Sequence, residues 1–450
     1  MGAVSLSGLP AAGAALAGSA AAAAPAWGAL LVDSLEAGAS AGIGAESVEI
    51  SAAREQARRR LRERPLPSRR QEDWRFTDPA ALAAIRPQRL AGEALAGIAD
   101  AVAALPPAGP GTLRLLLDGG SDPLAGVALP PGLEPIAVGE WGRWLNPEAR
   151  LDAAASGDPS PWSGLIAAAA GPVLALRVRA GLDTVLELVS EAGRAEGVLP
   201  LQLLLVLEPG ARLDLLQVHR ASGASLTAVR GVIHLGEGAS LRQGLIGQGA
   251  EPAALLADLA VLQQPGSELV FASAVSGWAL SRLEPRVLQA AGAASTRLRS
   301  LQRCDQRQVA DQHSSVRFEG PEGRLDQLHK AIAAGAGRSV FNGAVAVPRA
   351  AQRTDAAQLS RGLLLSDRAR IDSKPQLEIV ADDVTCAHGA TVSRLQEDEL
   401  FYLRSRGISA AMAGALLLRG YCAEVLAELP AAAALWQPLE FLLGEEAPTP

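Results

Sequence analysis

The sequence predicts a mainly β protein, a flattened parallel β-helix with two strands per coil that is flanked by N- and C-terminal α-helical regions. Two observations predict the β-helix. From about residue 172 onward, short apolar runs alternate with glycine turns, and helical periodicity disappears. In the same part of the chain, a unit that opens on glycine recurs at a nearly constant interval. Such repeats are typical of stacked coils, in which each coil buries its apolar face against its neighbours.

The repeating unit is a glycine turn followed by a short alternating segment, long enough for one strand of ~17–20 Å. Clear copies read GARLDLL, GASLTAV, GASLRQG and GSELVFA, and looser copies follow; the starting residues are Gly210, Gly223, Gly238, Gly266, Gly292 and Glu322. The interval between major copies is 28, 28 and 26 residues, and Gly223 lies near the middle of the first interval. Two strands therefore make one coil. A β-sandwich is the alternative, but its repeats would not be expected to share a leading Gly-Ala.

Composition divides the chain into four regions. Residues 1–45 are rich in Ala and Gly, and we expect a flexible or loosely helical tail. Residues 46–165 are predicted to form an N-terminal helical and loop-rich region, since charged helical periodicity gives way to repeated Pro-rich turns. The parallel β-helix core is predicted over residues 166–394, and a C-terminal helical domain over residues 395–450.

Charge and cysteine content exclude several classes of protein. The net charge of −7 gives no overall basic field for nucleic acid. Nine arginines lie between Arg54 and Arg75, but in an acidic protein a solvated helix face is the favoured interpretation. The three cysteines are far apart and odd in number, which argues against a disulfide framework and for a reducing compartment.

The N-terminal run has neither the pattern of an export signal nor that of a membrane span. It lacks a basic residue before its apolar part, and Pro, Gly and Ser interrupt it. The sequence also contains no phosphate loop of the type G-x-x-x-x-G-K-[ST], no G-x-G-x-x-G after a strand, no C-x-x-C and no H-E-x-x-H. We therefore expect no nucleotide bound by this chain and no association with a membrane.

The segment "ADDVTCAHGATVSRL" places Cys386 and His388 two positions apart. In an extended strand these side chains project to the same face, with Cα atoms about 6.5–7 Å apart. Three interpretations are open: a nucleophile with its base, half of a metal site that another chain or exogenous thiols complete, or buried packing. Zinc and iron centres want about four ligands, so the pair alone makes no closed site. The spacing by itself favours packing, because free cysteines are commonly small buried hydrophobes.

Helical periodicity returns after the β-helix. Ser393 is the predicted N-cap of a helix with acidic residues in its first turn, and Gly407 stands where a C-terminal glycine is expected. Beyond it lie more apolar residues than so short a tail can bury alone, among them Leu416, Leu417 and Leu418. These side chains either dock on the β-helix or bind a partner.

A long block at the end of the predicted β-helix resembles the SufB/SufD family of iron–sulfur cluster assembly proteins. The block runs from Gly337 to Ser409 and contains FNG, Q-x-T-D-A, LLLSD-x-A-x-I-D, P-Q-L-E-I, DDV-x-C-x-HGAT and FYLRSRGI in order. Upstream, EDWRFTD at Glu72–Asp78 is similar to the N-terminal motif of the SufD branch. The SufD branch is also the better match because the chain reads His388-Gly389-Ala390-Thr391, where SufB members read H-E-A-T.

The resemblance implies a right-handed β-helix and a non-catalytic scaffold. It implies pairing with a SufB-like β-helix subunit, with a homodimer as an alternative, and binding of a SufC-like ATPase through the C-terminal helices. His388 matches a histidine implicated in holding a nascent iron–sulfur cluster at the subunit interface, and Cys386 matches the nearby cysteine. The expected partner-binding residues are Phe401, Tyr402, Arg404, Arg406, Leu416 and Leu417. The expected compartment is the cytoplasm, or the plastid stroma in a photosynthetic eukaryote.

Two other functions are compatible with a β-helix. One is a polysaccharide-active enzyme, but such enzymes work with clustered carboxylates in a long groove, and no acidic cluster follows the strands here. The other is a purely structural pairing subunit with no ligand of its own, which only mutagenesis separates from the cluster scaffold.

Overall fold

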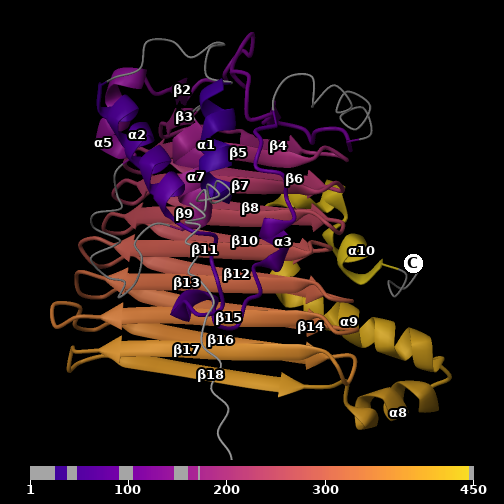
Figure 1. The fold of residues 1–450 in the computed structure, drawn as a ribbon. Helices are drawn as coiled ribbons and strands as arrows, with labels where there is room; N and C mark the ends of the chain where they lie inside the picture. The colour runs from indigo at the N-terminus through magenta and orange to yellow at the C-terminus, as the bar shows by residue number, and fades with distance from the viewer. Residues whose placement is uncertain (1–25, 38–47, 91–104, 146–160, 171–172, 445–450) are drawn as a thin grey trace, which may run out of the picture.

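The computed structural model describes residues 26–37, 48–90, 105–145, 161–170 and 173–444. In this part of the chain, two nine-stranded sheets lie face to face and run the length of the molecule (Figure 1). Neighbouring strands within each sheet are parallel, except where β2 pairs antiparallel with β3. From β3 onward successive strands alternate between the two sheets, so the predicted parallel β-helix with two strands per coil is confirmed.

Sheet A is the sheet that begins in space with β2. Its strands are β2 (Leu133–Pro135), β3 (Val173–Val178), β5 (Gly197–Leu207), β7 (Ser225–Leu235), β9 (Ala254–Gln263), β11 (Leu280–Gln289), β13 (Val309–Phe318), β15 (Arg338–Val347) and β17 (Arg370–Ile379).

Sheet B begins with β1. Its strands are β1 (Thr112–Leu116), β4 (Val185–Glu191), β6 (Arg212–Ala221), β8 (Ser240–Gly249), β10 (Glu268–Ser276), β12 (Ser295–Cys304), β14 (Arg324–Ala333), β16 (Asp355–Leu364) and β18 (Thr385–Ser393). Strands β1 and β2 thus come from the region predicted to be helical and loop-rich, and they extend the two sheets beyond the predicted core.

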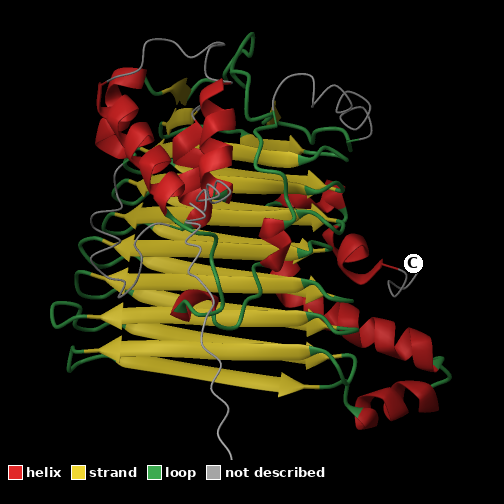
Figure 2. Cartoon of the chain, viewed as in Figure 1, coloured by secondary structure: helices red, strands yellow, loops and turns green. Residues whose placement is uncertain are grey.

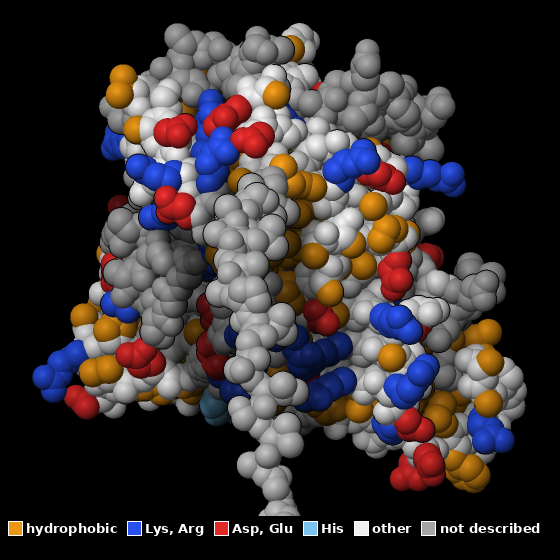
Figure 3. Space-filling model, in the orientation of Figure 1, with side chains coloured by type: hydrophobic (Ala, Val, Ile, Leu, Met, Phe, Trp, Pro, Cys, Tyr) orange, Lys and Arg blue, Asp and Glu red, His pale blue; other side chains and the backbone are white. Residues whose placement is uncertain are grey.

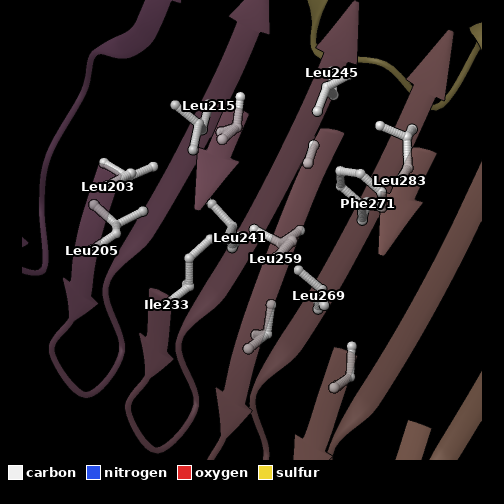
Figure 4. Close-up of a cluster of buried hydrophobic side chains, with 14 of the residues drawn as sticks. Leu203, Leu205, Leu215, Ile233, Leu241, Leu245, Leu259, Leu269, Phe271 and Leu283 are labelled. Carbon is white, nitrogen blue, oxygen red and sulfur yellow. The ribbon is translucent and has the colours of Figure 1, made fainter. Parts of the chain in front are cut away.

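The main hydrophobic core lies between the two sheets. Leucine, isoleucine and phenylalanine side chains from both sheets point toward one another there, including Leu205, Ile233, Leu241 and Phe271 (Figure 4). These side chains are at most 2% exposed. Because strand residues alternate between the two faces of a sheet, every second residue points into this interior and the others point outward.

The glycine that opens the major repeats lies in the turn before a strand of sheet B, whereas Gly223 precedes β7 of sheet A. Gly210, Gly238 and Gly266 have φ values of +71°, +63° and +69°, a left-handed conformation that favours glycine. The amide of Gly210 donates a hydrogen bond to the carbonyl of Glu237 in the next coil, at 2.9 Å. In the looser copies Ala293 and Glu322 take the same conformation (φ +51° and +62°). The turn geometry is therefore retained where the glycine pattern fades.

The N-terminal helices cover the outer face of sheet A (Figure 2). They are α1 (Trp27–Ala37), α2 (Val48–Glu63), α3 (Ala80–Ala83), α5 (Trp141–Trp144) and α7 (Trp162–Ala170). Helix α1 lies inside the segment predicted to be a flexible or loosely helical tail; residues 27–37 are helical, but they form a packed helix and not a tail. Leu31, Val32 and Leu35 are fully buried, because α1 packs its apolar side against α2 and α7. The other residues of the predicted tail lie outside the described residues.

Residues Glu72–Asp78, which we call the N-terminal strap, cross the outer face of sheet A. They include the 3-10 turn η1 (Glu72–Trp74). Trp74 is buried beneath the guanidinium of Arg282, whose carbon lies 4.3 Å from the centre of the indole ring. Glu72 forms an ion pair with Lys374 in β17, with 2.6 Å between Oε1 and Nζ. The strap thus joins the N-terminal region to coils far along the solenoid.

The C-terminal helices lie beside sheet B. They are α8 (Glu397–Ser405), α9 (Ala410–Leu426), η4 (Ala431–Trp436) and α10 (Pro438–Leu443). Helices α9, η4 and α10 cover the outer face of this sheet, and α8 packs on α9. Most of the apolar surplus predicted there docks on the β-helix: Leu418, Leu429, Trp436 and Leu442 are at most 7% exposed. Among the described residues, no helix is both long and apolar enough to cross a membrane.

The predicted N-cap Ser393 is wrong. Ser393 is the last residue of β18, and its hydroxyl donates to the carbonyl of Gly362 at 3.5 Å. Helix α8 begins after Gln396, which makes no side-chain capping bond. The predicted C-terminal glycine is confirmed, since Gly407 follows the helix with φ of +86°.

Candidate functional site

The last coil of the β-helix is uncapped. Strand β17 is the end strand of sheet A and pairs with β15, and β18 is the end strand of sheet B and pairs with β16. No further strand among the described residues pairs with their outer edges, and they form the lowest coil in Figure 1. An unpaired strand edge presents backbone N–H and C=O groups on which another chain can pair.

Cys386 and His388 both lie on β18, on the side that faces the interior of the solenoid. Their register partners in β16 are Ala356 and Gln358, which are 3% and 2% exposed. In β18 the corresponding positions are not covered by a further coil of the described residues. His388 is exposed, and its side chain makes no hydrogen bond to the described residues. Cys386 is half-buried.

The surroundings of Cys386 differ from those of His388. The thiol packs against the edge of the main hydrophobic core, and burial raises its pKa above the ordinary value. A thiol in this state is protonated near neutral pH, whereas metal ligation and nucleophilic attack both need the thiolate. Cys386 on its own therefore contributes packing, and it could bind a metal only where the metal displaces the proton.

The terminal coil offers too few ligands for a complete metal site. Among the described residues, no group of three or more His, Cys, Asp or Glu side chains comes close enough to hold a metal ion. Cys386 and His388 provide two donors, and iron or zinc centres commonly take about four. The pair can act on a metal or a cluster only together with donors from outside this chain.

Apolar side chains surround this pair on the last coil. Ile379 and Val380, at the end of β17, are 42% and 56% exposed, and Val392 in β18 is 48% exposed. Large aliphatic side chains at such exposures are uncommon within the described residues, and three of them lie on the last coil, Ile379 and Val380 near the start of β18 and Val392 near its end. The sequence analysis missed them, although the apolar end of P-Q-L-E-I-V at an unfinished coil is the signal that could have revealed them.

A second apolar surface lies on α8 and α9. Phe401 and Tyr402 are 72% and 57% exposed, and Met412 and Leu416 are 39% and 37% exposed. Figure 3 shows apolar side chains exposed over α8, at the lower right of the view. Of the other predicted partner-binding residues, Arg404 and Arg406 are exposed and Leu417 is half-buried. The Arg406 guanidinium lies 5.3 Å from the centre of the Tyr402 ring. We call Phe401, Tyr402, Met412 and Leu416 the α8–α9 surface.

The remaining cysteines and histidines lie away from this coil's open end. Cys304 and Cys422 are buried, and burial raises the pKa of each thiol to about 12, so both are packing residues. His219 and His329 are fully buried in the interior. His313 lies beside Arg282 and Asp311 beneath the N-terminal strap, with 3.1 Å between its Nε2 and an oxygen of Asp311.

The protein is a parallel β-helix with helices on both outer faces. Its last described coil has open strand edges and carries a Cys-x-His pair. Residues 190–421, more than half of the chain, match the family model described as "SUF system FeS cluster assembly, SufBD core domain". The chain therefore belongs to the SufBD family, and the resemblance inferred from the sequence is confirmed.

Curated relatives show the same relationship over parts of their length. The chain is 36% identical over 241 residues to an iron–sulfur cluster assembly SufBD family protein of Synechocystis, covering 51% of this chain and 53% of that protein. It is 41% identical over 171 residues to the chloroplastic protein ABCI7 of Arabidopsis thaliana, covering 38% of this chain and 36% of that protein. It is 48% identical over 99 residues to the iron–sulfur cluster assembly protein SufD of Escherichia coli, covering 22% of this chain and 23% of that protein. These matches span about half or less of each relative.

Proposed function

We propose that this protein is a non-catalytic scaffold subunit for iron–sulfur cluster assembly, of the SufD type. The observation that carries the proposal is the exposed imidazole of His388 on an uncapped coil, beside the thiol of Cys386. An isolated pair of donors suits a site shared between two subunits, where the partner supplies the remaining ligands to the nascent cluster. The cluster is the product that this site helps to build and is not a resident cofactor. An exposed site is suited to holding the cluster only briefly.

The pairing partner proposed is a SufB-like β-helix subunit that docks on the last coil. Unpaired edges of β17 and β18 would continue into the partner's sheets, and Ile379, Val380 and Val392 would be covered there. Docking of a second copy of this chain is the alternative occupant. Purification of the chain expressed alone and with the SufB-like subunit separates these two outcomes by the mass of the complex.

We expect His388→Ala to lower the yield of assembled cluster at least about tenfold, because losing a ligand should cost no less than losing the groups that orient one. The measurement is the visible absorbance and electron paramagnetic resonance of the cluster formed on the co-purified complex.

Thr391→Ala is the matched control for His388→Ala. Thr391 is also exposed on β18, but it alternates to the opposite face of the strand from His388. The control should leave the yield unchanged, and both variants should retain the partner. An unchanged yield from His388→Ala in an intact complex would favour a purely structural pairing subunit over a cluster scaffold.

The second proposed partner is a SufC-like ATPase, which would bind the α8–α9 surface. Phe401→Ser is expected to weaken this interaction by about 2 kcal/mol or more, roughly 30-fold, because exposed aromatic residues dominate such interfaces. Binding is measured by calorimetry with the purified ATPase. Glu399→Ala, on the same helix but a different face, should change the affinity little, and equal effects of the two variants would place the ATPase elsewhere.

ATP binding is assigned to that partner, and no nucleotide is proposed for this chain. The three free cysteines, far apart in the sequence, suit a reducing compartment. We therefore propose the cytoplasm, or the plastid stroma where the source is photosynthetic. Membership of the SufBD family makes the polysaccharide-active alternative unnecessary, since the fold is explained without a glycan groove.

A further inference from the structure

We propose that Gln358 positions the imidazole of His388: when the ring, which makes no hydrogen bond to the described residues, turns toward the interior, the side-chain oxygen of Gln358 accepts a hydrogen bond from Nδ1–H, which leaves Nε2 with a free lone pair for iron. The role of His388 as an iron ligand rests on the function proposed above, whereas the hydrogen bond rests on the interior of the β-helix.

His388 continues an interior column of registered side chains in sheet B. Each member lies one coil beyond the last, in the order Leu215, Gln243, Phe271, Leu298, Gln327, Gln358 and His388. The first six are buried, with exposures of at most 3%. His388 is the exposed last member, and Gln358 is therefore the side chain directly behind its ring. Registered side chains on one face of neighbouring strands lie about 5 Å apart at Cβ, within reach of a hydrogen bond between two long side chains.

A chain of hydrogen bonds runs from the amide of Gln358 to the hydroxyl of Ser314. Its Nε2 donates to the Oε1 of Gln327 at 2.9 Å, and the Nε2 of Gln327 donates to the hydroxyl of Ser314 at 2.6 Å. The Oε1 of Gln358 is buried and has no hydrogen-bond partner among the described residues. Because the Nε2 of the amide is taken up by Gln327, the oxygen remains available to the registered side chain of the last coil. A buried acceptor left without a partner is costly, and His388 offers the donor.

Two buried histidines in the same sheet already use this arrangement. Ser190 is the register partner of His219 one coil earlier, and its hydroxyl lies 2.8 Å from Nδ1 of that ring. Ser300 and His329 repeat the pair, again with 2.8 Å to Nδ1. An inward-facing histidine of sheet B therefore receives its Nδ1 contact from the registered residue one coil back. Gln358 occupies that position for His388.

The chemistry of the two kinds of partner differs. A serine hydroxyl either donates or accepts, so it permits both ring tautomers, whereas an amide oxygen only accepts. Gln358 therefore requires the hydrogen on Nδ1 and leaves Nε2 unprotonated and directed away from the interior. Metal-ligating histidines characteristically donate their other N–H to a fixed acceptor, which sets the tautomer and the orientation of the ring.

The test is the tautomer of His388 in the full chain without metal or partner. The protein is labelled with ¹⁵N-histidine and studied by NMR at a pH of about 8, where imidazoles are neutral, and His388→Ala assigns the signal. The wild-type ring should carry its hydrogen on Nδ1. Gln358→Met removes the acceptor at similar volume, and the major tautomer should change to the Nε2–H form that free histidine prefers. An Nε2–H ring in the wild type, or no response to Gln358→Met, would overturn the proposal.

Two further variants keep the test decisive. Gln243→Met is the matched control, because Gln243 is a buried glutamine of the same column four coils before Gln358, and it should leave the tautomer of His388 unchanged. Gln327→Met frees the amide of Gln358 to rotate, so it should reduce the Nδ1–H fraction without touching His388. This second variant also provides the test if Gln358→Met fails to fold.

The cluster assay distinguishes this role from the proposed function. In the complex, Gln358→Met should lower cluster yield roughly 10–100-fold, as loss of an orienting partner does. If His388→Ala leaves the yield unchanged while the tautomer responds as expected, the hydrogen bond stands and the iron role falls. If His388→Ala abolishes the yield while the tautomer does not respond, the function stands and the positioning by Gln358 is refuted.

Discussion

Asp311→Ala is expected to lower the free energy of unfolding by roughly 3–5 kcal/mol, because it removes one partner of a buried ion pair. Asp311 is fully buried, and one of its oxygens accepts hydrogen bonds from the hydroxyl of Thr77, at 2.5 Å, and from Arg282, at 2.9 Å. The variant would leave the guanidinium of Arg282, 2% exposed, with less compensation.

The ionised state of Asp311 is part of this effect. Burial alone would raise the pKa of Asp311, but His313, Arg282 and the hydrogen bond from Thr77 together hold that pKa below its usual value. Arg282 also donates to the carbonyl of Asp73 and to Glu284, and it covers the ring of Trp74. The carboxylate of Asp311 therefore helps to hold the N-terminal strap on sheet A. Its loss should weaken the contact between the strap and the sheet.

Urea unfolding at neutral pH measures this loss of stability. Asp311→Asn retains acceptor capacity without the charge and should cost less than alanine. The matched control is Asp326→Ala, which removes the partner of Arg299 from an exposed pair and should cost about 0.2–1 kcal/mol. A loss below about 1 kcal/mol for Asp311→Ala would show that Glu284 alone compensates Arg282.

The β-helix was predictable because its turn chemistry repeats along the chain. Gly210, Gly238 and Gly266 mark the same left-handed turn in successive coils, and that regularity is visible in one sequence. The placement of the N-terminal region was not predictable in this way. Thr77 and Asp311 are separated by 234 positions, and no local pattern relates one to the other. The packing of helix α1 was not predictable either, because its apolar side is buried against α2 and α7, which are separated from it in the sequence.

The candidate site was predictable to the level of one strand. Spacing alone places Cys386 and His388 on one face, and register with β16 gives the same side for both. Spacing could not reveal that no coil follows β18 within the described residues, which decides that His388 is exposed. Nor could it reveal Gln358 behind the ring, since that neighbour comes from the stacking of coils.

Acid sensitivity is expected from two histidines in the interior. His219 and His329 are both fully buried, and burial lowers their pKa values to about 4 and about 3. His219 lies between the hydroxyl of Ser190 and the amide oxygen of Gln217. His329 contacts Ser300 and stacks on Phe341 at 4.7 Å between ring centres. The charge of Asp311 acts on His329 in the opposite direction, toward a higher pKa, but burial dominates.

The unfolded chain protonates both imidazoles below about pH 6.5, whereas the folded chain keeps them neutral until about pH 4. Stability is therefore complete above pH 6.5 and is lost as the pH falls toward 4. At pH 5 the two histidines together should lower the free energy of unfolding by about 4 kcal/mol relative to pH 8.

Denaturant unfolding at several pH values in this range measures how the free energy of unfolding changes with pH. The double variant His219→Gln with His329→Gln should make that change smaller. Gln302→Met, a buried interior change that does not titrate, should lower stability equally at both pH values. If the double variant loses as much stability at low pH as the wild type does, the acid sensitivity comes from other titratable groups, because the variant no longer has these two protonation sites.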